Sequence, residues 1–262
     1  MVRIGILGCA GRMGRANILA GQSNPDVDIS CLWEAEGSEF IGADFREFGI
    51  EKPGKVAVFP KGVEDVDVII DFTAPLSTLS ALPVAVEHKK ALVIGTTGFD
   101  KEGKEEIAKA SQHVPIVFAP NMSLGVNLLF ALLKQAVSAL PGDYEVEIIE
   151  AHHHSKKDAP SGTALKLWEI VKSERQLSDK DLACGREGIV GARNGKEVGM
   201  HSIRCADIVG EHTVILAAIG ERIELAHKAS SRLAFAKGAI KAAVFLKGKD
   251  NGLYDVRSVL GI

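Results

Sequence analysis

The first half of the chain alternates short apolar runs rich in β-branched residues with amphipathic stretches, and this pattern restricts the fold more than any other feature. The expected strands span residues 2–7, 66–72, 91–94 and 115–118, and the expected helices span residues 12–21, 76–88 and 101–111. Strands and helices that alternate at this spacing form βαβ units with a parallel sheet. The pattern therefore predicts an α/β fold with a Rossmann-type, doubly wound parallel sheet.

The pattern changes around residues 121–125, where a long helix-like segment leads to a strand-like run over residues 144–151. After residue 185, strands without intervening helices are expected at 188–192, 200–206, 213–219 and 222–226, and helical periodicity returns at 231–246. Short turns between successive strands favour an antiparallel or mixed open sheet. We therefore expect one domain from residues 1–122 and 232–262, and a smaller α+β domain with a mixed open sheet from residues 123–231.

The expected strand around residues 214–218 is apolar at every position. A strand of this kind has both faces covered, either by helices or by another subunit. The run is therefore a first indication of an oligomer.

Charge, aromatic content and cysteine spacing exclude several classes of protein. The 31 Lys and Arg against 34 Asp and Glu give a formal charge of −3, so no basic field attracts nucleic acid, and 5% aromatic residues offer few stacking platforms. The four cysteines form no Cys-x-x-Cys pair and indicate neither a zinc site nor a disulfide framework. No apolar stretch reaches the ~18 residues of a membrane span, and no signal peptide is evident. We expect a cytoplasmic protein with no nucleic-acid or membrane partner.

A glycine-rich segment follows the first expected strand directly. Gly8, Gly11 and Gly14 have the spacing Gly-x-x-Gly-x-x-Gly at the start of the next helix. Glycines at such positions allow a sharp turn, close approach of backbone amides to a pyrophosphate, and tight packing of helix on sheet. The amides and the positive end of the helix then hold the phosphates. The alternative is tight packing alone, without a ligand.

Further residues at strand ends support a dinucleotide site. Glu34 follows Gly14 by 20 residues, where an acidic side chain accepts hydrogen bonds from the adenosine ribose, although an ordinary solvated charge is the alternative. Phe72-Thr73 and the loop 95–98 follow two later strands. Open α/β sheets bind ligands at the carboxyl ends of their strands, so these loops are expected to face the cofactor unless they are simple turns. Together they favour a nicotinamide or flavin dinucleotide.

The segment 150–164 has the highest density of chemically reactive side chains. It reads Glu-Ala-His-His-His-Ser-Lys-Lys-Asp-Ala-Pro-Ser-Gly-Thr-Ala. In a strand, His152 and His154 share a face and can chelate a metal, but no third ligand stands at an obvious spacing and Lys156 and Lys157 repel a cation. A solvated polar loop is the other alternative.

The second half of this segment is typical of an anion site. Asp158 or Ser161 is expected to cap a helix that carries Pro160 in an early position, so that the first turn exposes the amides of Gly162 and Thr163. A carboxylate there is stabilised by the helix dipole and by a charge-assisted hydrogen bond from a lysine. A histidine titrates near neutrality and can deliver a proton. A cofactor site on one domain, together with an acid and an anion-binding site on the other, indicates a reductase that acts on an anionic substrate.

These residues resemble the 4-hydroxy-tetrahydrodipicolinate reductase family, the dihydrodipicolinate reductases of lysine synthesis. The resemblance rests on His152-His153, Lys156 and the run 158–163, and it extends over the whole chain. Other matching segments are residues 8–14, 71–73, 95–98, 119–123 and 231–239.

The resemblance implies that NAD(P)H gives hydride to C4 of a cyclic dicarboxylate, with loss of the 4-hydroxyl as water, in lysine and diaminopimelate biosynthesis. It implies that His152 is the general acid, Lys156 the cation that polarises the substrate, His153 a substrate contact, and Gly162 and Thr163 the amides that hold a carboxylate. The implied cofactor contacts are Gly8, Cys9, Ala10, Gly11, Arg12, Met13, Glu34, Phe72, Gly95, Thr96, Thr97, Ala119, Pro120, Asn121 and Met122, and no metal is implied. The resemblance also implies that the first domain binds the dinucleotide. The second domain is then expected to bind the substrate and to form a homotetramer through its sheets.

Two further expectations concern geometry and cofactor choice. Adjacent strand residues point to opposite faces, so His152 and His153 reach one ligand only if the strand bends or ends near Ala151, and we expect it to end there. Many family members place an arginine after the acidic residue to bind the 2′-phosphate of NADPH, whereas here Ala35 follows Glu34. A carboxylate repels phosphate, so we expect dual use with NADH favoured, although Arg12 and Arg15 partly offset the repulsion.

Two alternative functions remain open on the residues alone. Another two-domain NAD(P)-dependent dehydrogenase, acting on an amino or keto acid, shares the glycine-rich loop but does not require the His-His-x-x-Lys run. A regulator that senses a dinucleotide without turnover usually needs a DNA- or partner-binding element, and the sequence offers none.

Overall fold

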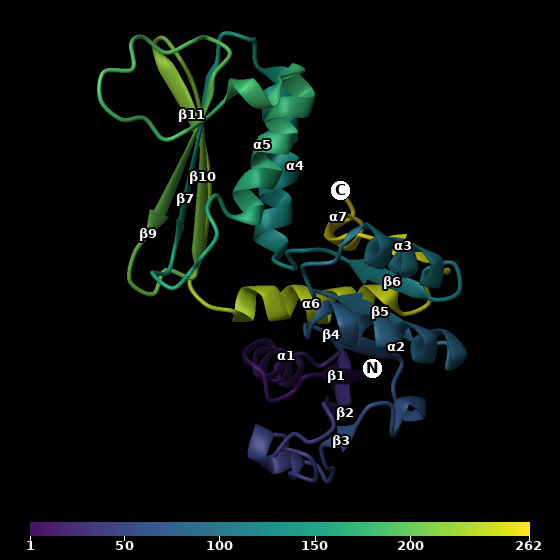
Figure 1. Ribbon diagram of the computed structural model, residues 1–262. Helices are drawn as coiled ribbons and strands as arrows, with labels where there is room; N and C mark the ends of the chain where they lie inside the picture. The colour runs from purple at the N-terminus through teal and green to yellow at the C-terminus, as the bar shows by residue number, and fades with distance from the viewer. The chain divides into compact units, whose positions relative to one another are not determined.

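Residues 1–262 are described by a computed structural model, in which the chain divides into two units (Figure 1). Unit 1 consists of Met1–Leu124 and Arg232–Ile262, and unit 2 consists of Gly125–Ser231. No helix in either unit has both the length and the apolar composition that a bilayer-spanning segment needs.

Unit 1 is built on a seven-stranded sheet with the strand order β12-β6-β5-β4-β1-β2-β3. The strands are β1 (Val2–Leu7), β2 (Val27–Glu34), β3 (Ala57–Val58), β4 (Val68–Asp71), β5 (Ala91–Ile94), β6 (Pro115–Phe118) and β12 (Gly252–Tyr254). Every neighbouring pair is parallel. The strand order reverses on either side of β1, so the expected Rossmann-type, doubly wound sheet is confirmed.

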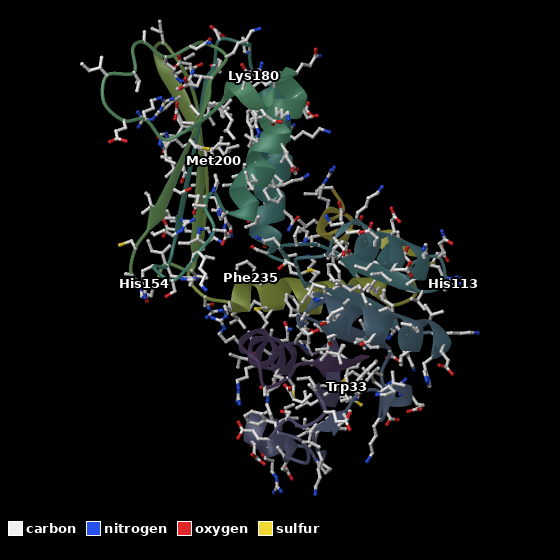
Figure 2. The ribbon with its side chains drawn as sticks, viewed as in Figure 1. Trp33, His113, His154, Lys180, Met200 and Phe235 are labelled. Atoms are coloured by element: carbon white, nitrogen blue, oxygen red, sulfur yellow. The ribbon has the colours of Figure 1, made fainter.

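Helices cover both faces of this sheet. They are α1 (Arg12–Gln22), α2 (Pro75–Glu87), α3 (Lys101–Ala110), α6 (Leu233–Leu246) and α7 (Val256–Leu260), with short 3-10 helices at Phe45–Phe48 and Val63–Asp65. On one face, Leu82 of α2 and Ile107 of α3 belong to a buried cluster with Ile69, Leu92 and Trp33, which is labelled in Figure 2. The sheet residues of this cluster are apolar, as expected of a parallel sheet covered by helices.

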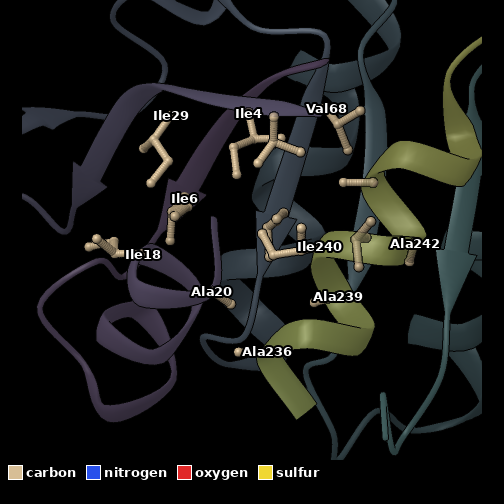
Figure 3. Close-up of a cluster of buried hydrophobic side chains, with 14 of the residues drawn as sticks. Ile4, Ile6, Ile18, Ala20, Ile29, Val68, Ala236, Ala239, Ile240 and Ala242 are labelled. Carbon is tan, nitrogen blue, oxygen red and sulfur yellow. The ribbon is translucent and has the colours of Figure 1, made fainter. Parts of the chain in front are cut away.

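The other face packs against α1 and α6. Figure 3 shows Ile4 and Ile6 of β1 beside Ile18 of α1, with Ala239 and Ile240 of α6 in the same cluster. Alanines at the contact surface allow a helix to approach the sheet closely. The carboxyl ends of β1, β2, β4, β5 and β6 therefore lie along one edge, between two layers of helices.

Unit 2 is a mixed five-stranded sheet with α4 and α5 on one face (Figure 1). Its strands are β7 (Glu145–His152), β8 (Leu182–Cys184), β9 (Val198–Arg204), β10 (Gly210–Ala218) and β11 (Glu221–Ala229), in the order β11-β10-β7-β9-β8. Its helices are α4 (Leu124–Ala139), α5 (Gly162–Arg175) and a 3-10 helix at Asp179–Asp181. The antiparallel pairs β10–β11 and β7–β10 and the parallel pairs β7–β9 and β8–β9 confirm the expected mixed sheet.

Within one chain, helices cover only one face of the unit 2 sheet. Val214 and Leu216 are fully buried against residues such as Leu133 and Trp168, whereas Ile215 on the opposite face is partly exposed. The apolar run 214–218 thus has one face covered by helices and one left open by the chain itself.

The expected strand at residues 188–192 is wrong. Those residues lie in a loop between β8 and β9, where Gly188 and Gly191 have φ values of +69° and +76°. Left-handed backbone at two positions interrupts an extended strand. The short strands β3, β8 and β12, of two or three residues each, were not expected.

Candidate active site

The loop after β1 turns sharply into α1. Gly8 has φ +65°, and its amide donates a 2.9 Å hydrogen bond to the carbonyl of Trp33. A Cβ added to Gly14 would lie 2.1 Å from the Gly8 carbonyl oxygen, so only glycine allows α1 to pack this closely. Gly11 is the N-cap of α1 and supplies no capping side chain. Backbone thus dominates this end of the helix, which suits a phosphate group.

Glu34 is attached to the same loop. Its Oε1 accepts a 2.7 Å hydrogen bond from the amide of Ala10. The carboxylate is therefore held beside the glycine-rich loop, which argues against the alternative of an unattached solvated charge. Arg15 donates through Nε to the Ala10 carbonyl at 3.1 Å, and its guanidinium lies 5.1 Å from the centre of the Phe48 ring.

Asp71 organises the next two loops on this edge. Its Oδ1 accepts hydrogen bonds from the amide and hydroxyl of Thr73, at 2.8 and 2.6 Å, and from the Thr96 hydroxyl at 3.2 Å. A Cβ on Gly95 would lie 2.2 Å from the Phe72 ring. The sequence reasoning did not assign Asp71 to the site, although a buried strand that ends in Asp before a threonine is a usable signal.

The remaining cofactor candidates follow β6 or lie in the glycine-rich loop. The Ala119 amide donates to the Ile94 carbonyl at 3.2 Å, and Asn121 Oδ1 accepts from the Ser123 amide at 2.9 Å. The side chains of Cys9 and Met122 are buried in the core, so only their backbone can contact a ligand. The side chains of Arg12, Thr97 and Pro120 are exposed, and those of Ala10, Met13, Glu34, Phe72 and Asn121 are partly exposed. The candidates of unit 1 thus gather at the carboxyl ends of its strands.

In unit 2 the chemically reactive segment begins at the end of β7. Glu150 and His152 are two residues apart on the strand and share one face. In the sheet register Glu150 is opposite His212 of β10, and His152 is opposite Arg204 of β9. The strand ends at His152, one residue after the expected end, and the chain turns at His154, which Figure 2 labels at the end of this sheet.

Glu150 is a fully buried carboxylate with several hydrogen-bond donors. Arg204 donates to both of its oxygens, at 2.9 and 2.8 Å, and the Ser161 amide donates to Oε1 at 3.2 Å. Burial opposes ionisation, but the hydrogen bonds from Arg204 and His152 lower the pKa of Glu150 to about 2. Glu150 therefore carries a negative charge at neutral pH.

The imidazole of His152 is held by that carboxylate. Its Nδ1 lies 2.6 Å from Glu150 Oε2, and because an ionised carboxylate only accepts, Nδ1 carries the proton. Nε2 is then the nitrogen available to a ligand. Burial lowers the pKa of His152 below its ordinary value, although Glu150 acts in the opposite direction. A histidine with one ring nitrogen held by a carboxylate and the other free to meet a ligand is suited to proton transfer.

The start of α5 lies against the same strands. Ser161 is its N-cap, with Oγ accepting from the Ala164 amide at 3.2 Å and lying 3.0 Å from His212 Nε2. Gly162 and Thr163 are the first two residues of the helix. The expectation that Pro160 occupies an early helical position is wrong, because the chain becomes helical only after Ser161. The cap is Ser161 rather than Asp158.

Lys156 is paired within its own loop. Its Nζ donates to both carboxylate oxygens of Asp158 at 2.8 Å, and this ion pair lowers the pKa of Asp158. Asp158 is 64% exposed, so the pair is open to exchange with another anion. The backbone carbonyl of His153 accepts a 3.1 Å hydrogen bond from the backbone amide of Lys156.

The structure does not bring His152 and His154 together. His154 Nδ1 lies 2.8 Å from the Ala206 carbonyl, whereas His152 Nδ1 is bound to Glu150. No group of three or more His, Cys, Asp or Glu side chains is arranged to hold a metal ion.

Three residues of this cluster were missed by the sequence reasoning, namely Glu150, Arg204 and His212. Glu150 has a local signal, because it precedes His152 by two residues on a strand. Arg204 and His212 have none, since their contacts depend on the register between distant strands.

Comparisons of the sequence with known proteins agree on one family. Residues 2–122 match the family model described as "Dihydrodipicolinate reductase, N-terminus", and residues 125–260 match "Dihydrodipicolinate reductase, C-terminus". The 4-hydroxy-tetrahydrodipicolinate reductase of Hahella chejuensis is 50% identical over 266 residues, covering 100% of both chains.

Solved structures show the same fold. A dipicolinate-bound dihydrodipicolinate reductase from Paenisporosarcina sp. TG-14 has a TM-score of 0.74 at 24% identity, with 97% of each chain covered. A probable dehydrogenase from Thermotoga maritima has a TM-score of 0.62 at 12% identity, covering 98% of this chain and 92% of the other.

Proposed function

Because the chain belongs to the dihydrodipicolinate reductase family, we infer that it reduces 4-hydroxy-tetrahydrodipicolinate to tetrahydrodipicolinate with NADPH or NADH. The reaction belongs to the synthesis of lysine and diaminopimelate. The observation that carries the inference beyond the family is the hydrogen-bonded pair of Glu150 and His152 at the end of β7. Glu150 also accepts the amide of Ser161, the N-cap of α5, and thereby joins the proposed proton donor to the helix end that is proposed to bind an anion.

Residues of unit 1 suit a nicotinamide dinucleotide. The left-handed Gly8, the missing side chain at Gly11 and the close packing at Gly14 leave backbone facing a pyrophosphate. Glu34, bound to Ala10, is at the position where a carboxylate accepts hydrogen bonds from the adenosine ribose. When bound, the reduced nicotinamide supplies the hydride.

We propose that NADH is preferred over NADPH while both are used. The Glu34 carboxylate repels a 2′-phosphate, and Ala35 offers no cation to offset it. Arg15 is engaged with the Ala10 carbonyl and the Phe48 ring, which leaves Arg12, an exposed side chain, as the other positive charge of this segment.

The side chains of unit 2 bind the substrate and move the proton. The amides of Gly162 and Thr163 hold one carboxylate at the positive end of α5. Lys156 exchanges Asp158 for the anionic substrate and withdraws electron density from the ring, and His153 supplies a further contact. Protonated His152 donates from Nε2 to the ring carbon next to the one that receives hydride. Loss of the hydroxyl together with a hydrogen of that neighbouring ring carbon releases water and leaves a ring double bond. This double bond takes up the hydride at one carbon and the His152 proton at the other, so atoms and charge balance.

A spectrophotometric assay tests this function. The chain is mixed with NADH or NADPH and with freshly formed condensation product of pyruvate and aspartate semialdehyde, and absorbance of the reduced nicotinamide is followed. Oxidation that requires both the condensation product and the chain is expected. If the chain binds NADH but oxidises neither cofactor with this substrate, the function is wrong.

We further propose that the chain forms a homotetramer through the open face of the unit 2 sheet. Ile203 is 47% exposed on this face, and Ile149 and Ile215 are partly exposed beside it. Apolar residues on an uncovered sheet face favour burial against another copy. Sedimentation should give the mass of four chains, and Ile203→Asp should lower it. A monomeric chain at micromolar concentration would contradict the proposal.

We assign the reaction to the cytoplasm. All four cysteines are free thiols, and Cys184 and Cys205 are exposed. Exposed thiols persist in a reducing compartment, which supports this assignment.

A further inference from the structure

We propose that Glu150 and Arg204 form a positioning pair that holds His152 with its Nδ1–H on the carboxylate, so that Nε2 is the nitrogen that delivers the proton. The inference rests on the proposed function insofar as His152 is the proton donor. Neither Glu150 nor Arg204 needs to touch the substrate for this role, because both act through the imidazole.

The geometry leaves the Glu150 carboxylate little freedom. Oε2 contacts His152 Nδ1 at 2.6 Å and Arg204 Nη1 at 2.9 Å, while Oε1 contacts Arg204 Nη2 at 2.8 Å and the Ser161 amide at 3.2 Å. A bidentate guanidinium fixes the carboxylate plane as well as its position. Since Arg204 also donates to the Asp158 carbonyl at 2.6 Å, the pair connects His152 to the loop that carries Lys156.

The Glu150 carboxylate also affects the protonation of His152, because it is one of several charged groups around the ring. The ionisable groups that face the imidazole are Glu150 on its own strand, Arg204 on β9, His212 on β10 and Lys156 in the following loop. Only Glu150 is negative, and it alone favours the protonated ring. The neighbouring His212 remains neutral, because burial lowers its pKa to about 4. Loss of the Glu150 charge therefore makes His152 lose its proton at a lower pH.

The same carboxylate also holds the start of α5. Its Oε1 accepts the amide of Ser161, the residue that caps the helix whose first amides are proposed to bind the substrate. A glutamine at position 150 keeps an oxygen for this contact but loses the charge. The substitution Glu150→Gln thus separates the effect on the imidazole from the effect on the helix.

The test compares full-length wild-type protein with Glu150→Gln by two measurements. Nitrogen NMR of the His152 ring reads its tautomer and its titration midpoint, and kcat is measured across the pH range. We expect the Nδ1–H tautomer in the wild type, and in Glu150→Gln a midpoint lower by about one pH unit or more. At a pH above the midpoint, a midpoint lower by about one pH unit means about tenfold less protonated His152, so kcat near neutrality should fall about tenfold with a smaller change in KM.

Glu147→Gln is the matched control. Glu147 lies on β7 with its side chain on the opposite face, and it too contacts a histidine, His201 Nε2, at 2.8 Å, and an arginine, Arg186 Nη2, also at 2.8 Å. Its replacement changes the charge of the same strand by the same amount. The His152 midpoint should not move in this variant.

Glu150→Gln leaves Arg204 without its carboxylate, which destabilises a protein. If the variant does not fold, as judged by NADH binding and circular dichroism, the double substitution Glu150→Gln with Arg204→Met removes both charges. Its midpoint should still be lower than that of the wild type, but by less than in Glu150→Gln, because Arg204 itself lowers the pKa of His152. An unchanged midpoint in a folded variant, or an Nε2–H tautomer in the wild type, would overturn the proposal. If the wild type shows no reductase activity, the proposed function fails, whereas the NMR titration still decides the positioning role.

Discussion

The backbone amide of Ala10 donates a 2.7 Å hydrogen bond to the carboxylate of Glu34, which joins the loop after β1 to the end of β2. The two residues are 24 positions apart in sequence, and the contact holds a negative charge beside the proposed phosphate site. This relationship gives the proposed preference for NADH a structural cause.

Ala35→Arg should therefore shift the preference toward NADPH. A guanidinium next to Glu34 binds the 2′-phosphate and offsets the carboxylate. We expect the ratio of kcat/KM for NADPH to that for NADH to rise by about tenfold, equivalent to about 1.4 kcal/mol. Glu39→Gln, at an exposed position nearby, changes the net charge equally and should leave the ratio unaltered. An equal rise in this control would mean that overall charge rather than the position next to Glu34 sets the preference.

His152→Ala should lower kcat by about 10²–10⁴-fold, the usual contribution of a general acid, with NADH affinity nearly unchanged.

Lys156→Ala should also lower kcat severely, because the substrate loses the positive charge that binds and polarises it. Lys157→Ala, an exposed neighbour, is the control for Lys156. Steady-state kinetics and titration of nicotinamide fluorescence measure the two effects. Loss of NADH binding in either variant would show that these side chains serve a different pocket.

Gly210→Ala should impair catalysis more than folding. An added Cβ would lie 3.1 Å from His152 Nε2, which forces the ring to move by a few tenths of an ångström. A displacement of that size should lower kcat about tenfold, since misplacement by 1 Å costs up to ~10²-fold. Gly195→Ala, where an added Cβ meets no atom within 4 Å, is the matched control. Steady-state kinetics measure the loss of kcat, and thermal unfolding measures any loss of stability. A wild-type kcat in Gly210→Ala would show that the His152 ring has room to adjust.

His212 should make unit 2 less stable in mild acid. Burial, reinforced by His152, lowers its pKa to about 4, whereas an unfolded histidine titrates near 6.5. Between these values the unfolded chain binds more protons, so stability falls as pH falls, by at most about 1.4 kcal/mol per pH unit.

Urea unfolding at about pH 7, 6 and 5 checks this, with the fluorescence of buried Trp168 reporting on unit 2 in a Trp33→Phe background. His212→Gln should flatten the dependence on pH, although it also alters the contact with Ser161. A dependence of the same steepness in His212→Gln would assign the effect to another group.

Several features of the fold and site follow from residues close together in sequence. The alternation of strands and helices predicted a doubly wound sheet, because periodicity reflects which faces are buried. The glycines at positions 8, 11 and 14 indicated a tight strand-to-helix turn, since the missing side chains act locally. Ser161 was one of two expected caps for the same reason, because a cap bonds to amides two or three residues away. The expected strand at 188–192 failed where Gly188 and Gly191 adopt left-handed backbone.

The sequence by itself thus determined the class of fold, the glycine-rich turn typical of a dinucleotide site, and the segment that carries the proposed proton donor. Only the tertiary structure decided that Arg204 and His212 surround Glu150, that Asp71 organises two loops, and that one face of the unit 2 sheet is left open by the chain. The physical reason is that strand register and burial depend on packing between residues tens of positions apart. A buried carboxylate acquires its partners and its charge from that packing rather than from its neighbours along the chain.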